Sequence, residues 1–128
     1  MRKATAVWLQ DVEDECEMAE LLLVHGKRHG ACLHSEQAVE KALKALILER
    51  GERPPRTHDL FELANRVAAL GWQVAVPADM LALLNSVYRG RYPSDEGLLP
   101  SSEPTPEEAQ SAAMAARQVL ATVRAATG

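Results

Sequence analysis

The sequence lacks an apolar run long enough to cross a membrane, and it contains only two cysteines. A bilayer span needs roughly 18 consecutive apolar residues, and residues 1–4 lead directly into an amphipathic pattern rather than into a signal peptide. Cys16 and Cys32 fall at apolar positions of two separate helical patterns, which indicates small core residues kept reduced rather than a redox pair. We therefore expect a soluble, cytoplasmic protein that makes no membrane contact.

Several motifs of ligand and cofactor chemistry are also missing. The sequence has no glycine-rich phosphate loop, no HExxH helix, no cysteine–histidine cluster and no GxSxG turn, so we expect no bound metal, no cofactor and no acyl-transfer hydrolase. The formal charge is −4 and the pI is near 5.6, whereas proteins that coat nucleic acid usually carry a broad basic surface. Any contact with a nucleotide or RNA must therefore be local.

Helical periodicity dominates what is present. The 128 residues are 47% hydrophobic, which is enough for one domain over residues 1–128 with a core of its own. No alternating strand pattern, internal repeat or low-complexity tract occurs, and five segments carry apolar residues at helical spacing. The sequence therefore predicts an all-α fold, most simply an antiparallel bundle.

Glycine, proline and capping residues set the expected helix boundaries. The first helix is expected over about 4–23 and the second over about 31–48, with Gly26 and Gly51 at their ends. Thr57 is expected to cap a short third helix that has Asp59 in its first turn. A fourth helix follows residue 77. The last begins at Thr105, where a proline and a glutamate complete a capping pattern, and residues 90–104 show no helical pattern.

The turn after the second helix carries the residues best suited to chemistry. Arg53, Arg56 and His58 lie within six positions. Arginine binds phosphate through a planar fork, and histidine can move a proton near neutral pH. The alternative is structural: His58 begins the third helix and hydrogen-bonds locally, while Asp59 stabilises the amino terminus of that helix.

Other basic and aromatic residues are candidates for ligand contacts. Arg89 and Arg91 are candidate phosphate ligands and Tyr92 a candidate stacking surface for a base. The alternative is a helix end whose arginines neutralise carbonyl groups while the tyrosine covers the core. Lys41 and Lys44 lie three residues apart on one helix face and would extend a basic groove towards Arg53 and Arg56, or else are simply solvated.

Several motifs in order resemble the prokaryotic HEPN domain, whose name stands for higher eukaryotes and prokaryotes nucleotide-binding. They are the Trp8-Leu9 pair, the stretches 19–22 and 31–46, the Thr57-His58-Asp59-Leu60 turn and the Arg91-Tyr92-Pro93 element. The resemblance implies a bundle of four long helices plus a short one, commonly a homodimer. It also implies a minimal nucleotidyltransferase partner, often as a toxin–antitoxin pair.

The resemblance bears on chemistry as well. Some members are metal-independent endoribonucleases that carry an arginine and a histidine separated by four to six residues, and Arg53 and His58 satisfy this spacing with four residues between them. In those nucleases the motif lies later in the chain, and here no histidine follows Arg89. Arginine would stabilise charge on the phosphate, while histidine takes the proton of a ribose 2′-hydroxyl.

Three functions follow as hypotheses. The first is a dimeric module that binds nucleotide or RNA through its basic turn and acts with a nucleotidyltransferase. The second is a ribonuclease toxin that uses Arg53 and His58. The third is an interaction protein without any ligand.

Overall fold

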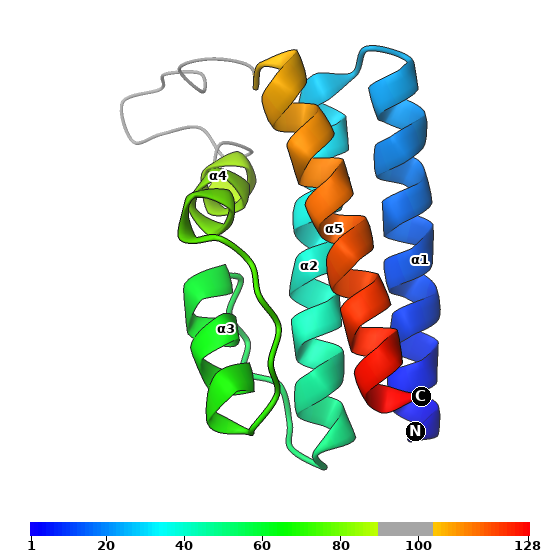
Figure 1. Cartoon of the computed structure of the whole chain (residues 1–128), viewed down its shortest axis with the longest axis vertical. Coiled ribbons are helices and arrows are strands. Elements are labelled where there is room, and N and C mark those ends of the chain that lie inside the picture. The colour runs from blue at the N-terminus through cyan, green and yellow to red at the C-terminus, as the bar shows by residue number, and fades with distance from the viewer. Residues whose placement is uncertain (90–103) are drawn as a thin grey trace.

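Residues 1–89 and 104–128 are described by the computed structural model, and this part of the chain forms five α-helices (Figure 1). The helices are α1 (Lys3–Val24), α2 (Arg28–Glu49), α3 (Leu60–Ala69), α4 (Ala78–Arg89) and α5 (Pro106–Thr127). Three of them, α1, α2 and α5, have 22 residues each, whereas α3 has 10 and α4 has 12. The predicted all-α bundle is confirmed.

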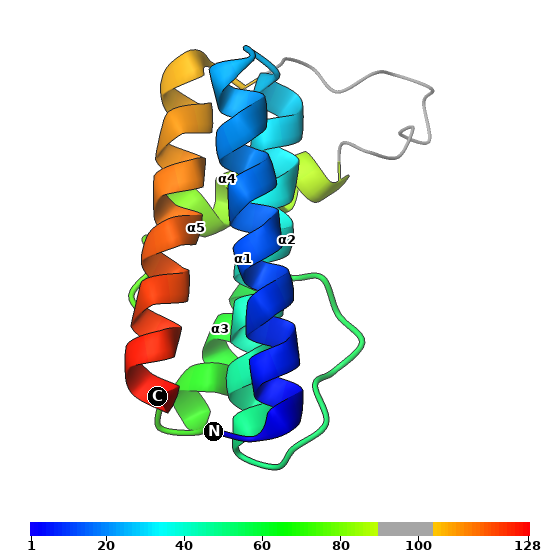
Figure 2. The ribbon, with the colours of Figure 1, turned by 90° about the vertical axis from the view of Figure 1, so that its right-hand side faces the viewer.

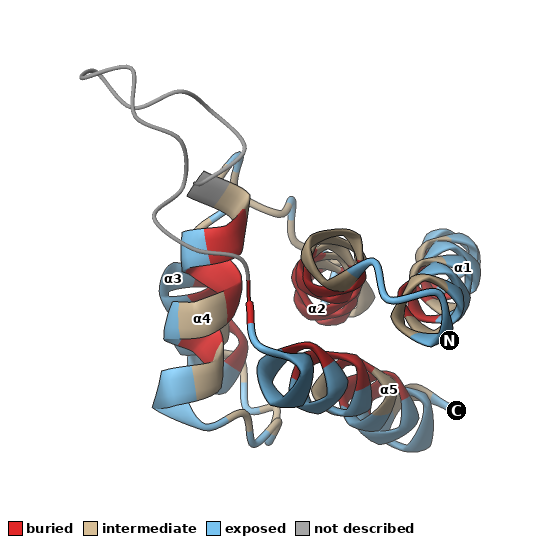
Figure 3. Ribbon diagram, turned by 90° about the horizontal axis from the view of Figure 1, so that it is seen from above, coloured by how far each residue is buried: buried red, intermediate tan, exposed pale blue. Residues whose placement is uncertain are grey.

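The central element of the bundle is α2, because it packs against each of the other four helices. The first helix, α1, runs antiparallel to α2 and to α5, and both chain termini lie at the same end of the molecule (Figures 1 and 2). Seen from above, α3 and α4 lie on the side of α2 away from α1 (Figure 3). None of the helices in the described ranges is long and apolar enough to cross a membrane.

The position of α2 explains how far it is buried. A surface helix usually buries one stripe of its circumference, but α2 has neighbours on several sides and buries polar as well as apolar residues. Its buried residues are Ala31, Cys32, Ser35, Glu36, Ala38, Val39, Glu40, Ala42, Leu43, Ala45, Leu46 and Ile47.

The second helix, α2, begins at Arg28, three residues earlier than the sequence pattern indicates.

The helix boundaries mostly match the expectation. Gly26 and Gly51 follow α1 and α2 with φ angles of 71° and 81°, a region that costs glycine little because it lacks a Cβ atom. Thr105 caps α5: its hydroxyl accepts a hydrogen bond from the Glu108 amide at 3.0 Å, and the Glu108 carboxylate accepts one from the Thr105 amide at 2.8 Å. The predicted capping box is therefore confirmed.

The start of α3 differs from the prediction. Asp59, rather than Thr57, is the N-cap, and its carboxylate accepts a hydrogen bond from the Phe61 amide at 3.0 Å. The Thr57 hydroxyl instead accepts a hydrogen bond from the Asp59 amide at 3.1 Å, within the turn that precedes the helix. Both residues can cap a helix, so the local pattern did not show which of them does.

Charged side chains join α1 to α5 outside the core. Arg117 on α5 forms ion pairs with Glu13 and Glu20 on α1, and Arg124 binds Glu13 at 2.9 Å. These hydrogen bonds, the one from Arg117 above all, hold the pKa of Glu13 below its usual value. The two cysteines behave as predicted: both are free and buried, and burial raises the pKa of each thiol to about 11.

Candidate functional site

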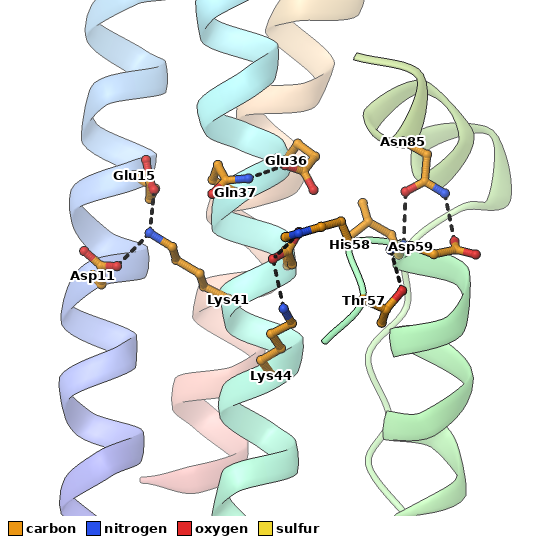
Figure 4. A network of polar contacts seen from close by, with 12 residues as sticks. Asp11, Glu15, Glu36, Gln37, Lys41, Lys44, Thr57, His58, Asp59 and Asn85 are labelled. Carbon is orange, nitrogen blue, oxygen red and sulfur yellow. Dashed lines mark hydrogen bonds and ion pairs between the residues drawn. The ribbon is translucent and has the colours of Figure 1, made fainter. Parts of the chain in front are cut away.

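The connection between α2 and α3 is tied to α4 at the residue after His58. The side-chain oxygen of Asn85 on α4 accepts a hydrogen bond from the Leu60 amide at 3.0 Å, and its side-chain nitrogen donates one to Asp59 at 3.0 Å (Figure 4). Together with the Asp59 cap, these bonds fix the backbone on the α3 side of His58. The position of the His58 side chain is therefore set by the fold.

The His58 imidazole reaches across to α2. Its Nδ1 atom lies 3.0 and 3.1 Å from the two carboxylate oxygens of Glu40, and the Lys44 amine donates to the same carboxylate at 3.1 Å (Figure 4). The Glu40 and Lys44 side chains are only 7% and 11% exposed, whereas that of His58 is 52% exposed. A buried carboxylate thus holds a solvent-accessible imidazole.

This geometry determines which ring nitrogen can act. A carboxylate only accepts hydrogen bonds, so Nδ1 of His58 must carry the proton that it shares with Glu40. In the neutral ring the lone pair then lies on Nε2, which does not contact Glu40. The local hydrogen bond expected at His58 in the structural alternative was wrong, because the partner lies 18 residues away on another helix. The other part of that alternative is confirmed, because Asp59 caps the amino terminus of α3.

An aromatic ring completes the surroundings of His58. Tyr88 on α4 stacks on the imidazole with ring centroids 4.6 Å apart and an interplanar angle of 27°. Stacking on Tyr88 covers one face of the imidazole and restricts its rotation. The α4 helix therefore supplies both the Asn85 tie and the aromatic neighbour.

Arg53 and Arg56 lie on the same connection and are exposed. Neither forms a hydrogen bond or ion pair with any residue in 1–89 or 104–128. Arg50 differs, because its guanidinium lies 3.9 Å over the Trp72 ring and its Nε donates to the Leu70 carbonyl at 3.2 Å. We use the name His58 site for His58, Glu40, Lys44 and Tyr88 together with Arg53 and Arg56.

Lys41 lies on a different side of α2 from His58. Its amine donates to Asp11 and to Glu15 of α1, both at 2.7 Å (Figure 4). Glu15 also contacts Nδ1 of His34 at 2.7 Å. Burial opposes the charged form of Lys41, but the two carboxylates outweigh it and raise its pKa. Both lysines of the predicted basic groove are thus matched by carboxylates.

Two hollows differ in chemistry. A groove of about 480 Å³ runs between α1 and α2, and it is lined by Val7, Trp8, Gln10, Asp11, Asp14, Glu40, Lys41 and Lys44. A larger hollow of about 840 Å³ lies between α5 and the α3–α4 connection, and no charged side chain is found among its described lining residues. Of these two hollows, the α1–α2 groove is the one that shares residues with the His58 site, namely Glu40 and Lys44.

Sequence reasoning missed three members of this arrangement. The three missed members are Glu40, Tyr88 and Asn85, none of which is among the candidates that the sequence indicates. A signal existed for Glu40, because it stands between runs of small and aliphatic residues and has a lysine four residues later. Three other predicted ligand-binding residues, Arg89, Arg91 and Tyr92, remain predictions. Arg91 and Tyr92 lie outside the described residues, and only the backbone of Arg89 is described.

Metal binding finds no support in the described ranges, where no group of three or more histidine, cysteine, aspartate or glutamate side chains could hold an ion.

Comparison with known proteins gives a family and a fold. The HEPN domain model matches residues 5–126. The crystal structure of TT1696 from Thermus thermophilus is similar, with 27% sequence identity, a TM-score of 0.71 and coverage of 97% of this chain and 98% of that one. The crystal structure of ST0689, an archaeal HEPN homologue, has 24% identity, a TM-score of 0.69 and full coverage of both chains at 100%, and it shows the fold alone. No curated protein matches this chain.

Proposed function

Because this chain belongs to the HEPN domain family, we propose that it binds a nucleotide or an RNA strand at the His58 site. The observation that carries this proposal is the exposed His58 imidazole, held by the buried Glu40 carboxylate and stacked on Tyr88. Two arginines on the same connection have no partner in the described part of the chain, so their guanidinium groups are free to bind phosphate.

The charged residues of the His58 site would have different roles in binding. Glu40 and Lys44 largely neutralise one another, so the carboxylate does not present a full negative charge to an approaching phosphate. Tyr88 covers one face of the imidazole, and the exposed part of His58 can contact a sugar, while Arg53 and Arg56 supply the positive charge. As in other members of the family, we propose a homodimer that acts beside a minimal nucleotidyltransferase.

Replacing Arg53 or Arg56 by alanine is expected to weaken RNA binding. Each exposed phosphate contact supports affinity through counterion release, so each loss should make the dependence of affinity on salt less steep by roughly one phosphate contact. Titration of a short single-stranded RNA at several salt concentrations, followed by fluorescence anisotropy, measures both affinity and slope. The matched control is Arg124→Ala, which removes the same charge at the α1–α5 seam.

The outcome of this titration separates the first and third hypotheses. Unchanged affinity and slope in both Arg53→Ala and Arg56→Ala would place RNA elsewhere on the molecule and overturn the proposal. Absence of binding to RNA, to GMP and to ATP by the wild-type protein would favour an interaction protein without ligand.

A second function, metal-independent RNA cleavage, is favoured by one specific observation. The Glu40 contact leaves the lone pair of neutral His58 on Nε2, and an exposed imidazole oriented in this way is suited to take the proton of a ribose 2′-hydroxyl. Arg53 would then stabilise the charge that develops on the phosphate.

Cleavage of RNA in the presence of a chelator is the expected result for this second function. His58→Ala should lower the rate by at least about a hundredfold, the usual contribution of a general base. The Arg53→Ala variant should also be slower. Gel analysis of labelled RNA measures the rates, and equal cutting by the wild type and both variants would assign the activity to a contaminating nuclease.

A further inference from the structure

We propose that the groove between α1 and α2 is a nucleobase subsite that takes guanine from a ligand whose phosphate lies at the His58 site. This inference rests on the proposed function, because it concerns the other end of the same ligand. The groove has a volume of about 480 Å³, and pockets for small ligands commonly measure about 300 to 1,000 Å³. Its size alone therefore suits a nucleoside.

The walls of the groove match the faces of a base. Trp8 is partly buried and packs against the core, so its indole is held in place while part of it lines the groove. Val7 beside it is 68% exposed and adds an aliphatic surface. Aromatic side chains stack on bases of any sequence, because every base presents a π-face. Trp8 and Val7 thus supply an apolar wall for a planar ring.

The polar groups of the groove select the edge of that ring. Asp14 is exposed, and within residues 1–89 and 104–128 its carboxylate meets only the Gln10 amide, at the long distance of 3.5 Å, so both of its oxygens can accept from a ligand. One oxygen of Asp11 is used by Lys41. Carboxylates accept hydrogen bonds but donate none, and guanine presents an imino and an amino N–H side by side. A guanine edge facing Asp14 would satisfy both groups.

Charge also decides which end of the ligand enters the groove. Lys41 is bound by Asp11 and Glu15, and Lys44 is bound by Glu40, so neither amine is free to attract a phosphate. The carboxylate of Asp14 adds a negative charge without a cation partner among the described residues. A phosphate is therefore disfavoured in the groove, whereas an uncharged base is not.

The two subsites share a wall. Glu40 and Lys44 line the groove, and the same Glu40 carboxylate binds His58 on the other side. Because Glu40 belongs to both, the groove and the His58 site are adjacent. In the proposed arrangement a single nucleotide spans this shared residue, with its base against Trp8 and its phosphate beside His58, Arg53 and Arg56.

The test compares GMP with ribose 5-phosphate, which keeps the sugar and phosphate but lacks the base. Isothermal titration of the wild-type chain is expected to give at least roughly tenfold tighter binding of GMP. Asp14→Ala should remove most of that advantage and leave ribose 5-phosphate unaffected. Glu17→Ala, an exposed acidic residue of the same helix that does not line the groove, is the matched control.

The indole N–H signals in nitrogen-resolved NMR spectra give a second readout. The Trp8 signal, identified by its absence in Trp8→Phe, should move with GMP but not with ribose 5-phosphate. Trp72 is an internal control, because it lines the larger hollow and donates to the Leu46 carbonyl.

The outcomes separate the two proposals. Equal affinities for the two ligands, or an unmoved Trp8 signal with GMP bound, would overturn the base subsite and leave phosphate binding at the His58 site standing. An Asp14→Ala variant that binds GMP as tightly as the wild type would also overturn the guanine assignment. Failure of both ligands to bind would overturn the subsite, whereas the RNA titration of the Arg53→Ala and Arg56→Ala variants decides the proposed function separately.

Discussion

Replacing Leu43 by alanine is expected to lower the free energy of unfolding by about 2 to 5 kcal/mol. Leu43 lies in the middle of α2 and is 1% exposed. The helix that carries it packs against all four others, so the cavity left by the missing methyl groups cannot close without moving several helices at once. Since a small domain has only about 5 to 15 kcal/mol of stability in total, the loss should be large.

Urea denaturation followed by far-ultraviolet circular dichroism measures this loss as a lower midpoint. The matched control is Leu21→Ala, the same chemical change on α1 at a residue that is 60% exposed. That control should change stability by no more than about 0.5 kcal/mol. Similar costs for the two variants would contradict the placement of α2 at the centre of the core.

Local signals in the sequence were sufficient for most helix boundaries. A positive φ at Gly26 and Gly51 and the reciprocal bonds of Thr105 and Glu108 depend on residues close together in the chain, so short patterns predict them. The early start of α2 was missed because its N-cap, Lys27, forms no side-chain cap that the sequence could signal. The exchange of roles between Thr57 and Asp59 was missed because both residues can cap a helix and they lie two positions apart. The deep burial of α2 depends on the four helices around it and is not a local property.

The candidate site shows the same limit more sharply. The basic turn was recognised because Arg53, Arg56 and His58 are near neighbours in the sequence. Its partner Glu40 lies on α2 and Tyr88 lies on α4, and no periodicity indicates that these helices meet at the imidazole. Lys41 and Lys44 were read as a basic pair, yet their carboxylate partners lie on α1 and within α2. Ion pairs between helices can be identified only once the tertiary structure is known.

Replacing Glu40 by alanine is expected to destabilise the fold by about 3 kcal/mol, because it leaves the largely buried Lys44 side chain, 11% exposed, without its carboxylate. The nearly buried pair should also behave as a unit. Glu40→Ala combined with Lys44→Met should therefore cost less than the sum of the two single variants. Urea denaturation of the four proteins measures this coupling, and strictly additive costs would contradict the ion pair. Glu17→Ala, at an exposed position, provides the baseline for loss of a carboxylate.

The same substitution distinguishes a positioning role of Glu40 from a merely structural one. With Glu40 present, neutral His58 should show a protonated Nδ1 and a free Nε2 in nitrogen NMR spectra, since the carboxylate accepts at 3.0 and 3.1 Å from Nδ1. Without Glu40 the two tautomers should mix, and the Nε2 signal should move towards that of a protonated nitrogen. Glu40→Gln keeps an accepting oxygen, so it should retain much of the original tautomer. Identical His58 spectra for the wild type and Glu40→Ala would show that α2 contributes only packing to this site.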